Sequence, residues 1–408
     1  MGASLLIVIT FIYNRCSIYP PHKLAQAGAA AHDPRYDTLL AIAELLEARG
    51  HRVLAVPIDR PYQLNEYPRV VAAINRFGYY SPDHERRPDL FIKWFGARAD
   101  RLEPWRSRFE NVPTLVFENG VFKDSVIVDP KGLLGDSFYA ASLEGRVQEG
   151  FDEGKCRAKL ESMSSTSKRP QSPYIDIPEE IRGNYIFVPT QKFLDLSVTK
   201  YSSVSMPELL EKVAKYCTLS STPMVVKIHP HLEGIELGQQ KAYVAKLQST
   251  YKNIYLSHAS ITFLTQHALA TATLNGGTLV DNFNSQTPVV SFARSLFSNS
   301  TALVYDTSVE RGLTRLSSQH LPWSAARKLR QQQVVCWLHD MSLFSSKTPE
   351  ANLETLQRHI DALLEGGVKK LDILDQADSD TRLPKPEIDE KHLVEVIKRP
   401  AHTKLCLQ

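Results

Sequence analysis

The sequence lacks a run of apolar residues long enough to cross a bilayer. Its longest apolar stretch lies at the start, from Ser4 to Tyr13. This is only half of the roughly 20 residues that a membrane-spanning helix needs. No basic segment precedes it and no persuasive A-x-A-like site follows, so a buried first strand is a better interpretation than a signal peptide. Any membrane role is therefore expected to be peripheral.

Excess charge and cysteine patterning are missing as well. A net charge of +3 over 408 residues leaves no basic surface of the kind that binds nucleic acid. The five cysteines are scattered and odd in number, without metal-ligand spacing. This pattern favours a reducing compartment over a disulfide framework, and so a cytoplasmic protein.

Several catalytic signatures are absent. The chain has no G-x-S-x-G elbow, no HExxH and no CxxC. Hydrolase, zinc-protease and thioredoxin-like functions therefore have no starting point. With 43% hydrophobic and 23% charged residues, the composition is that of a soluble globular protein long enough for two domains.

Strand-like and helix-like segments alternate, which indicates parallel sheets with helices on both faces. Strands are expected at 5–12, 53–58, 88–92, 114–117, 185–189, 224–228, 254–256, 270–274 and 289–292, and helices at 35–49, 207–216, 239–248, 323–338 and 349–364. We predict an N-terminal α/β domain at 1–154, a polar linker at 155–182, a second α/β domain at 183–320, and C-terminal helices with a tail at 321–408. Two such domains are expected to face a central cleft.

Polar residues follow two of the expected strands, where ligands of open α/β sheets bind. Gln191, Asp195 and Ser197 come after the strand 185–189. Gln191 and Ser197 could orient Asp195 and leave one carboxylate oxygen free as a nucleophile. The alternative is an aspartate that binds local backbone N–H groups at a turn or helix start.

The dipeptide His229-Pro230 follows the Lys227-containing strand 224–228. Such a histidine can donate to a phosphate oxygen, and Lys227 could assist it or simply flank it. A structural histidine in a turn is the alternative. The neighbouring His231 does not make a metal site, because no third ligand has convincing spacing.

Two further segments complete the candidate site. Glu118 follows the strand 114–117 and could serve as a general acid, or be a solvated turn residue. The run Asn275-Gly276-Gly277-Thr278 precedes an expected helix, whose N-terminus could bind a phosphate. Neither a G-x-G-x-x-G nor a Walker loop is present, so dinucleotide and ATP sites are not supported.

In order and spacing, residues 110–310 resemble the bacterial capsule-polysaccharide biosynthesis family of retaining β-Kdo glycosyltransferases. The matching segments are E-N-G-V-F-K-D-S from Glu118, D-P-K-G-L-L-G-D-S-F-Y from Asp129, the Gln191–Asp195–Ser197 group, Lys227 with His229-Pro230, and Asn275 to Asp281 followed by P-V-V. Asn119, Lys123-Asp124 and Asp281 depart from the residues usual in that family.

The resemblance implies a GT-B-like fold and transfer of Kdo from CMP-Kdo, without a required metal or cofactor, to a glycan or glycolipid acceptor. By position Asp195 would be the nucleophile and Glu118 the acid/base. His229, Pro230, Lys227, Gln191 and Ser197 would contact the donor together with Asn275–Thr278. The acceptor is expected near Asn14–Tyr36 and Tyr67–Arg87. The departures at Asn119 and Asp281 leave a different nucleotide sugar open, and a non-catalytic scaffold subunit is a further alternative.

Overall fold

The computed structural model describes residues 4–11, 34–57, 76–81, 83–94, 106–163, 174–193, 195–230, 232–318 and 323–364. The first expected acceptor segment, Asn14–Tyr36, lies almost wholly outside these residues, and the second lies partly outside them. No helix within the described ranges is long and apolar enough to span a membrane.

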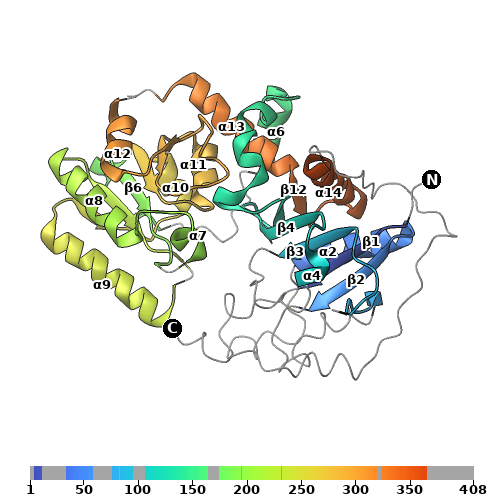
Figure 1. Ribbon diagram of the computed structural model, residues 1–408. Coiled ribbons are helices and arrows are strands. Elements are labelled where there is room, and N and C mark those ends of the chain that lie inside the picture. Colours follow the sequence, from blue (N-terminus) through green and yellow to red (C-terminus); the bar gives the residue numbers. More distant parts are fainter. Residues whose placement is uncertain are drawn as a thin grey trace. The chain divides into compact units, whose positions relative to one another are not determined.

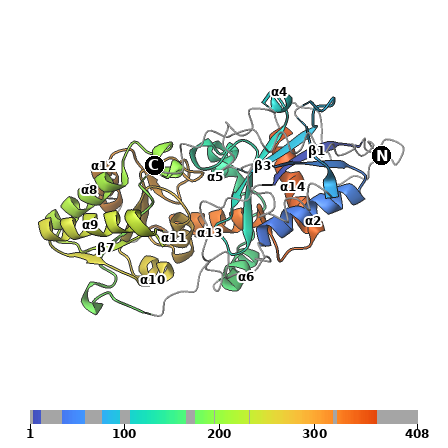
Figure 2. The same cartoon turned by 90° about the horizontal axis from the view of Figure 1, so that it is seen from below.

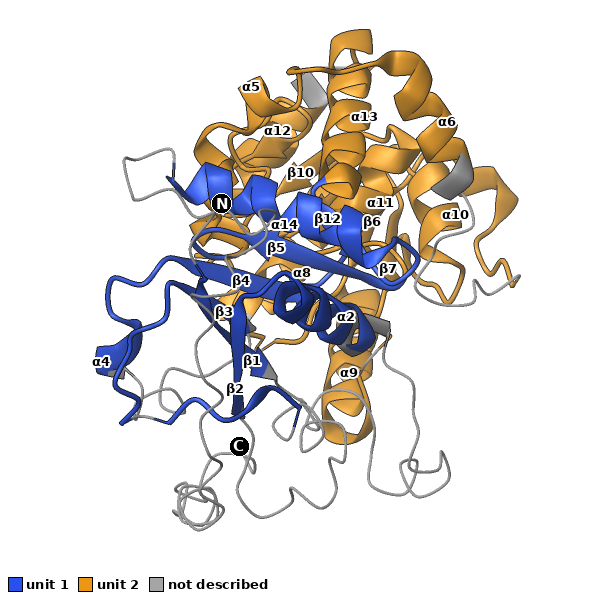
Figure 3. Cartoon of the chain, turned by 90° about the vertical axis from the view of Figure 1, so that its right-hand side faces the viewer, with its two compact units in different colours: residues 1–120, 124–132, 341–408 blue, residues 121–123, 133–340 orange. Residues whose placement is uncertain are grey.

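The chain forms two compact units (Figures 1 and 3). Unit 1 comprises residues 1–120, 124–132 and 341–408, and unit 2 comprises residues 121–123 and 133–340. Each unit contains its own six-stranded sheet. The predicted α/β class with two Rossmann-type domains is therefore confirmed.

Unit 1 has a mixed sheet. Its strands lie in the order β12 (Ser342–Phe344), β5 (Ser125–Asp129), β4 (Thr114–Asn119), β3 (Leu90–Trp94), β1 (Leu6–Phe11) and β2 (Arg52–Pro57). The strands β4, β3, β1 and β2 are parallel, whereas β5 runs antiparallel to both of its neighbours. Because β1 lies between β3 and β2 and the sheet is covered on both faces, Leu6 to Thr10 are buried, and the strand is almost continuously apolar.

Two helices distant in sequence cover one face of this sheet. Helix α2 (Pro34–Ala48) contacts α14 (Pro349–Leu364), and both contribute apolar side chains to one core with the strands (Figure 2). The opposite face packs against Phe109 of the short helix α4 (Arg106–Phe109). Unit 1 thus depends on a helix that is made after all of unit 2.

Unit 2 has an all-parallel sheet. The strand order is β11 (Val304–Tyr305), β10 (Val289–Ser291), β9 (Ala270–Thr273), β6 (Ile186–Pro189), β7 (Met224–Lys227) and β8 (Ile254–Leu256). Counted along the chain, the order is 3-2-1-4-5-6 from β8 to β11. This is the order of dinucleotide-binding Rossmann folds, and it reverses between β6 and β9.

Amphipathic helices cover both faces of the second sheet. On one face, α8 (Met206–Leu219), α9 (Gly234–Thr250) and α12 (Val309–Ser318) share a core with the strands. Helix α8 starts where the hydroxyl of Ser205 accepts a hydrogen bond from Glu208 N at 3.2 Å, which caps the first turn. The other helical elements of unit 2 are η4 (Leu134–Asp136), η5 (Phe138–Ala141), α5 (Leu143–Arg146), α6 (Glu153–Met163), η6 (Glu179–Ile181), α7 (Leu196–Thr199), α10 (Ile261–Gln266), α11 (Thr278–Ser285) and α13 (Ala325–Asp340).

The compact units divide the chain differently from the predicted domains. The predicted boundary after residue 154 lies inside unit 2, and the predicted linker 155–182 contains most of α6 and all of η6. The polar composition of this segment has another cause, because α6 is a largely exposed helix that contacts the rest of unit 2 through α13. The C-terminal helices also separate, since α13 belongs to unit 2 and α14 to unit 1.

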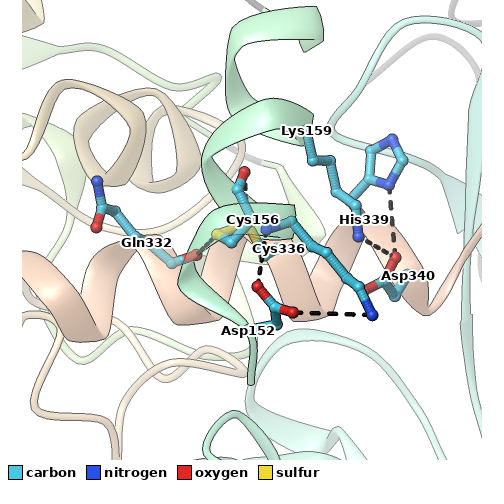
Figure 4. The surroundings of a disulfide bond; sticks show 8 residues. Asp152, Cys156, Lys159, Gln332, Cys336, His339 and Asp340 are labelled. Carbon is cyan, nitrogen blue, oxygen red and sulfur yellow. Dashed lines mark hydrogen bonds and ion pairs between the residues drawn. A yellow bond between two sulfur atoms is a disulfide. The ribbon is translucent and has the colours of Figure 1, made fainter. Parts of the chain in front are cut away.

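Two of the scattered cysteines form a disulfide, which corrects the expectation of free thiols. Cys156 on α6 is joined to Cys336 on α13, although 180 residues separate them in sequence (Figure 4). An ion pair between Lys159 and Asp340 lies on the same two helices, so α6 and α13 are linked twice. Cys217 is buried and free, and burial raises the pKa of its thiol to about 12.

Candidate functional site

The candidate site lies at the carboxyl edge of the unit 2 sheet. All six strands are parallel, so the loops after β6, β7 and β9 emerge at one edge. The strand order reverses between β6 and β9, and ligands of such sheets bind at this switch point. Gln191 follows β6 and Asn275 follows β9, so both loops border it.

A hydrogen-bond network joins these two loops. Gln191 Nε2 donates to the backbone oxygen and to Oδ1 of Asn275, both at 2.9 Å. Asn275 Nδ2 donates in turn to the backbone oxygen of Ser197 at 2.7 Å. The structure therefore brings together three residues from two of the predicted motifs. Asn275 is 2% exposed, and both Oδ1 and Nδ2 of its side chain form hydrogen bonds within the protein. Asn275 therefore fixes the loops and offers little to a ligand.

Asp195 lies at the N-terminus of α7. Its Oδ1 accepts a hydrogen bond from Ser197 N at 2.8 Å, and its backbone oxygen accepts from the N–H groups of Val198 and Thr199. The sequence left open whether Asp195 is a local cap, and it is one. Gln191 is directed to Asn275 instead of orienting Asp195. The other carboxylate oxygen, Oδ2, accepts no hydrogen bond from the part of the chain that the structure describes.

The loop that carries His229 is fixed through its backbone. His229 N donates to Thr190 Oγ1 at 2.9 Å, and Thr190 Oγ1 donates to Gln240 Oε1 at 2.7 Å. Gln240 Nε2 donates to the backbone oxygen of Gln191 at 2.7 Å. Thr190 therefore ties the loop after β6 to the loop after β7, and Gln240 on α9 holds the loop after β6 at two points. Pro230, next to His229, is exposed.

Sequence reasoning missed Thr190 and Gln240. Gln240 is 2% exposed, although glutamine is usually a surface residue. The one available signal was its place within the expected helix 239–248, where a polar residue on the buried face requires a hydrogen-bond partner.

Lys227 is held by the loop after β8. Its Nζ donates to the backbone oxygens of Ala259 at 2.7 Å and His258 at 3.3 Å. Burial lowers the pKa of Lys227, and the nearby Asp176 carboxylate opposes this shift. Lys227 therefore joins the ends of β7 and β8, which matches the flanking role that the sequence left open.

The run Asn275–Thr278 leads into α11. Gly276 has φ +100°, a left-handed conformation that suits glycine. Within the described residues, the backbone N–H groups of Gly276, Gly277 and Thr278 donate to no acceptor. Three N–H groups at the start of a helix favour an anion. The phosphate site that the sequence predicted at this run stays a prediction.

Glu118 belongs to unit 1. It lies in β4, which extends to Asn119 and pairs with β5, so the expected loop after Phe117 is a hairpin. Glu118 Oε1 accepts a hydrogen bond from Asn119 N at 2.7 Å. Gly120 closes the hairpin, where a Cβ would overlap the hydroxyl of Ser125. Glu118 and Asp195 therefore belong to different units, and their meeting in one site stays a prediction.

No group of three or more His, Cys, Asp or Glu side chains within the described ranges could hold a metal ion.

Residues 169–330, which cover most of unit 2, match the model of the family described as capsule polysaccharide biosynthesis protein. The resemblance predicted from the motifs is confirmed. All the candidate residues of unit 2 fall inside this match.

No curated protein sequence matches the chain. Similar solved structures include two from Thermosulfurimonas dismutans KpsC. Its beta Kdo 2,7 transferase is 14% identical, with a TM-score of 0.44 over 82% of this chain and 90% of that chain. Its beta Kdo 2,4 transferase is 13% identical, with the same TM-score over 82% and 91%. A UDP-GlcNAc 2-epimerase of Methanocaldococcus jannaschii is 10% identical, with a TM-score of 0.31 over 82% and 99%.

Proposed function

We propose that the protein is a glycosyltransferase of surface or capsular polysaccharide biosynthesis, which transfers Kdo from CMP-Kdo with retention of configuration. The observation that carries this proposal is the network at the switch point of unit 2. It unites Gln191, Ser197 and Asn275 beside Asp195, in the part of the chain that matches the capsule family.

The donor's phosphate would bind at the N-terminus of α11. The N–H groups of Gly276, Gly277 and Thr278 would donate to its oxygens, and the helix dipole favours negative charge there. His229 would donate to the same phosphate from the neighbouring loop. Thr190 and Gln240 hold this loop relative to Gln191, so both sides of the phosphate site would be preorganised.

Transfer would proceed by two displacements. Asp195 Oδ2 attacks the anomeric carbon, the bond from that carbon to the phosphate oxygen breaks, and CMP leaves with the electron pair. An acceptor hydroxyl then attacks the same carbon, releases Asp195 and gives its proton to Glu118. Two inversions give net retention, and they require the two carboxylates to approach within about 5 Å at the sugar.

With a nucleotide-sugar donor, the reaction would take place in the cytoplasm. The acceptor would be a glycan or a glycolipid, and a lipid-linked acceptor would bring the protein into peripheral contact with the membrane. The second candidate function uses another nucleotide sugar. It is favoured by Asp281, which puts a carboxylate in the first turn of α11, close to the proposed phosphate site.

The experiment is a donor panel combined with intact-mass analysis. The purified protein is incubated with CMP-Kdo, other CMP-sugars and UDP-sugars, and nucleotide release is measured. Release from CMP-Kdo with a Kdo adduct on the peptide that contains Asp195 supports the proposal. Release from a different donor selects the second candidate. Nucleotide binding without turnover of any donor would instead favour a scaffold subunit.

A further inference from the structure

The second acid of the segment D-P-K-G-L-L-G-D has no part in the mechanism above. This residue, Asp136, lies at the end of η4 in unit 2. Its Oδ2 accepts hydrogen bonds from Lys200 Nζ at 2.6 Å and from Tyr201 Oη at 3.0 Å. Both donors follow α7 directly in the chain. Asp136 therefore holds the segment that begins with the proposed nucleophile.

Residues 195–202 form one short helical unit, here called the α7 segment. Asp195 caps its start, and Ser202 N donates to the backbone oxygen of Val198 at 3.0 Å at its end. A displacement of Lys200 and Tyr201 is therefore passed on to Asp195, because a single hydrogen-bonded turn separates them.

Other contacts hold the α7 segment to the sheet edge. Asn275 binds the backbone oxygen of Ser197, as described above. Arg294 N donates to the backbone oxygen of Tyr201 at 2.9 Å, and Ser202 forms an antiparallel bridge with Ala293. These contacts involve backbone atoms of the α7 segment, whereas Asp136 accepts hydrogen bonds from two of its side chains.

The backbone that carries Asp136 is pressed against the α7 segment. A Cβ at Gly135 would lie 2.6 Å from Arg294 Cβ and 2.8 Å from Tyr201 Cδ1, so only glycine fits. The preceding Leu134 has φ +55°, a left-handed conformation that costs a leucine energy. Such strain persists only where the surroundings impose it, and it concentrates at functional sites.

The ion pair itself adds little to global stability. The side chains of Lys200 and Asp136 are 48% and 36% exposed, and ion pairs in water contribute weakly to folding. The hydrogen bond from Lys200 holds the pKa of Asp136 below its usual range, and Asp136 raises the pKa of Lys200. The contact is therefore fully charged at neutral pH. Its loss should be visible at the site and not in the melting temperature.

We infer that Asp136 is a positioning residue, which fixes the α7 segment and thereby the attacking carboxylate of Asp195. The inference rests on the proposed function, because it assigns Asp136 to the same reaction.

The test compares Asp136→Asn with a matched control. The control is Glu310→Gln, which removes another exposed ion pair of unit 2, from Lys212 at 3.3 Å. Asp136→Asn should lower kcat about 10- to 100-fold, the scale expected for a misplaced reacting group, with donor KM changed less than about threefold. Amide hydrogen exchange in residues 195–202 should speed up by about tenfold or more, while Tm stays unchanged. Glu310→Gln should leave all four quantities unchanged.

Gly135→Ala provides a second variant that keeps the charges and pushes η4 away from Tyr201. It should reproduce the fall in kcat and the faster exchange of residues 195–202. Unchanged kcat and exchange in Asp136→Asn would overturn the inference. A higher donor KM with unchanged exchange would also overturn it, since Asp136 would then contact the donor. If the wild type turns over no donor, the proposed function fails, and the exchange measurement alone decides the positioning role.

Discussion

The carboxyl edges of the two sheets hold their polar residues in different ways. In unit 2, the half-buried Gln191 and the buried Asn275 and Gln240 form side-chain hydrogen bonds that hold the loops after β6 and β9. In unit 1, Glu118 binds the backbone of its own neighbour at the end of a hairpin. The edge of unit 2 is therefore held by side chains that reach from one element to another, whereas the hydrogen bond from Asn119 to Glu118 stays within one strand.

The largest expected effects come from the two carboxylates. Asp195→Asn should lower the transfer rate by at least about 10⁴-fold, because it removes the nucleophile. Glu118→Gln should lower it about 10²- to 10⁴-fold, the range of general acid–base catalysis. Initial rates and intact mass measure both. Glu118→Gln should accumulate the sugar adduct on Asp195, since the phosphate leaves without its help. An active Asp195→Asn enzyme would contradict the assignment.

The next effect concerns the link between α6 and α13. Cys336→Ser should lower the free energy of unfolding of unit 2 by about 2–5 kcal/mol, because the disulfide closes a long loop of the unfolded chain. Denaturant unfolding measures the loss, and hydrogen exchange in α2 of unit 1 should not change. A reducing agent should destabilise the wild type and leave the variant as it is. A map of non-reduced peptides without a Cys156–Cys336 pair would contradict the structure.

A smaller effect tests the network. Asn275→Ala removes one of the two acceptors of Gln191 Nε2 and the side-chain donor to the backbone oxygen of Ser197. The loss of hydrogen-bond partners for these partly buried groups should cost unit 2 about 1–3 kcal/mol of unfolding free energy. Lys131→Ala, at an exposed position next to β5 in unit 1, should stay within about 0.5 kcal/mol. Equal values for the two variants would remove the contrast between the edges.

The smallest expected effect is a difference between the two units in how their stability depends on pH. In unit 1, burial lowers the pKa of His359 to about 3, and the imidazole donates to the backbone oxygen of Met341. The unfolded chain binds this proton below pH 6.5 and the folded chain does not. Unit 1 should therefore lose about 1.4 kcal/mol of stability per pH unit as pH falls from 6.5.

Unit 2 should respond only in stronger acid. Burial raises the pKa of Asp340, but the neighbouring imidazole of His339 and the hydrogen bond from Lys159 outweigh it and bring the pKa to about 2. Its stabilising contribution is present above the unfolded value of 3.8 and is lost as pH falls towards 2. Hydrogen exchange in α14 and α13 at pH 6.5 and 5.5 checks the difference. His359→Asn should flatten the response of α14, and an unaltered response would exclude His359 as its origin.

The apolar segments of the chain predicted most of the fold. The strands β6, β7 and β8 were expected within a residue or two, because their apolar runs are bounded by turn residues. The two-residue β11 and the three-residue β12 were missed, since pairing with a neighbour defines them more than composition does. The disulfide could not be predicted either, because the approach of α6 to α13 is decided by packing.

Three of the residues predicted for the site lie together in the structure, but the hydrogen bonds between them were not predicted. Gln191, Ser197 and Asn275 were expected together, since the ends of parallel strands meet at one edge. Which atoms form hydrogen bonds with one another depends on distances of a few tenths of an ångström, and the spacing of residues in the sequence does not determine these distances. Gln240 and Asp136 were invisible as positioning residues for this reason. Both act through loops that reach them only after the sheet has formed.

The return of β12 and α14 to unit 1 has a consequence for synthesis on the ribosome. The unit 1 residues up to 132 emerge before residues 133–340. Until residue 364 has been made, their sheet lacks the strand β12, and α2 lacks its neighbour α14. Residues 133–340 are almost the whole of unit 2 and emerge in between as a single stretch. Unit 1 is therefore begun before unit 2 and completed after it, with the edge of β5 open in the meantime.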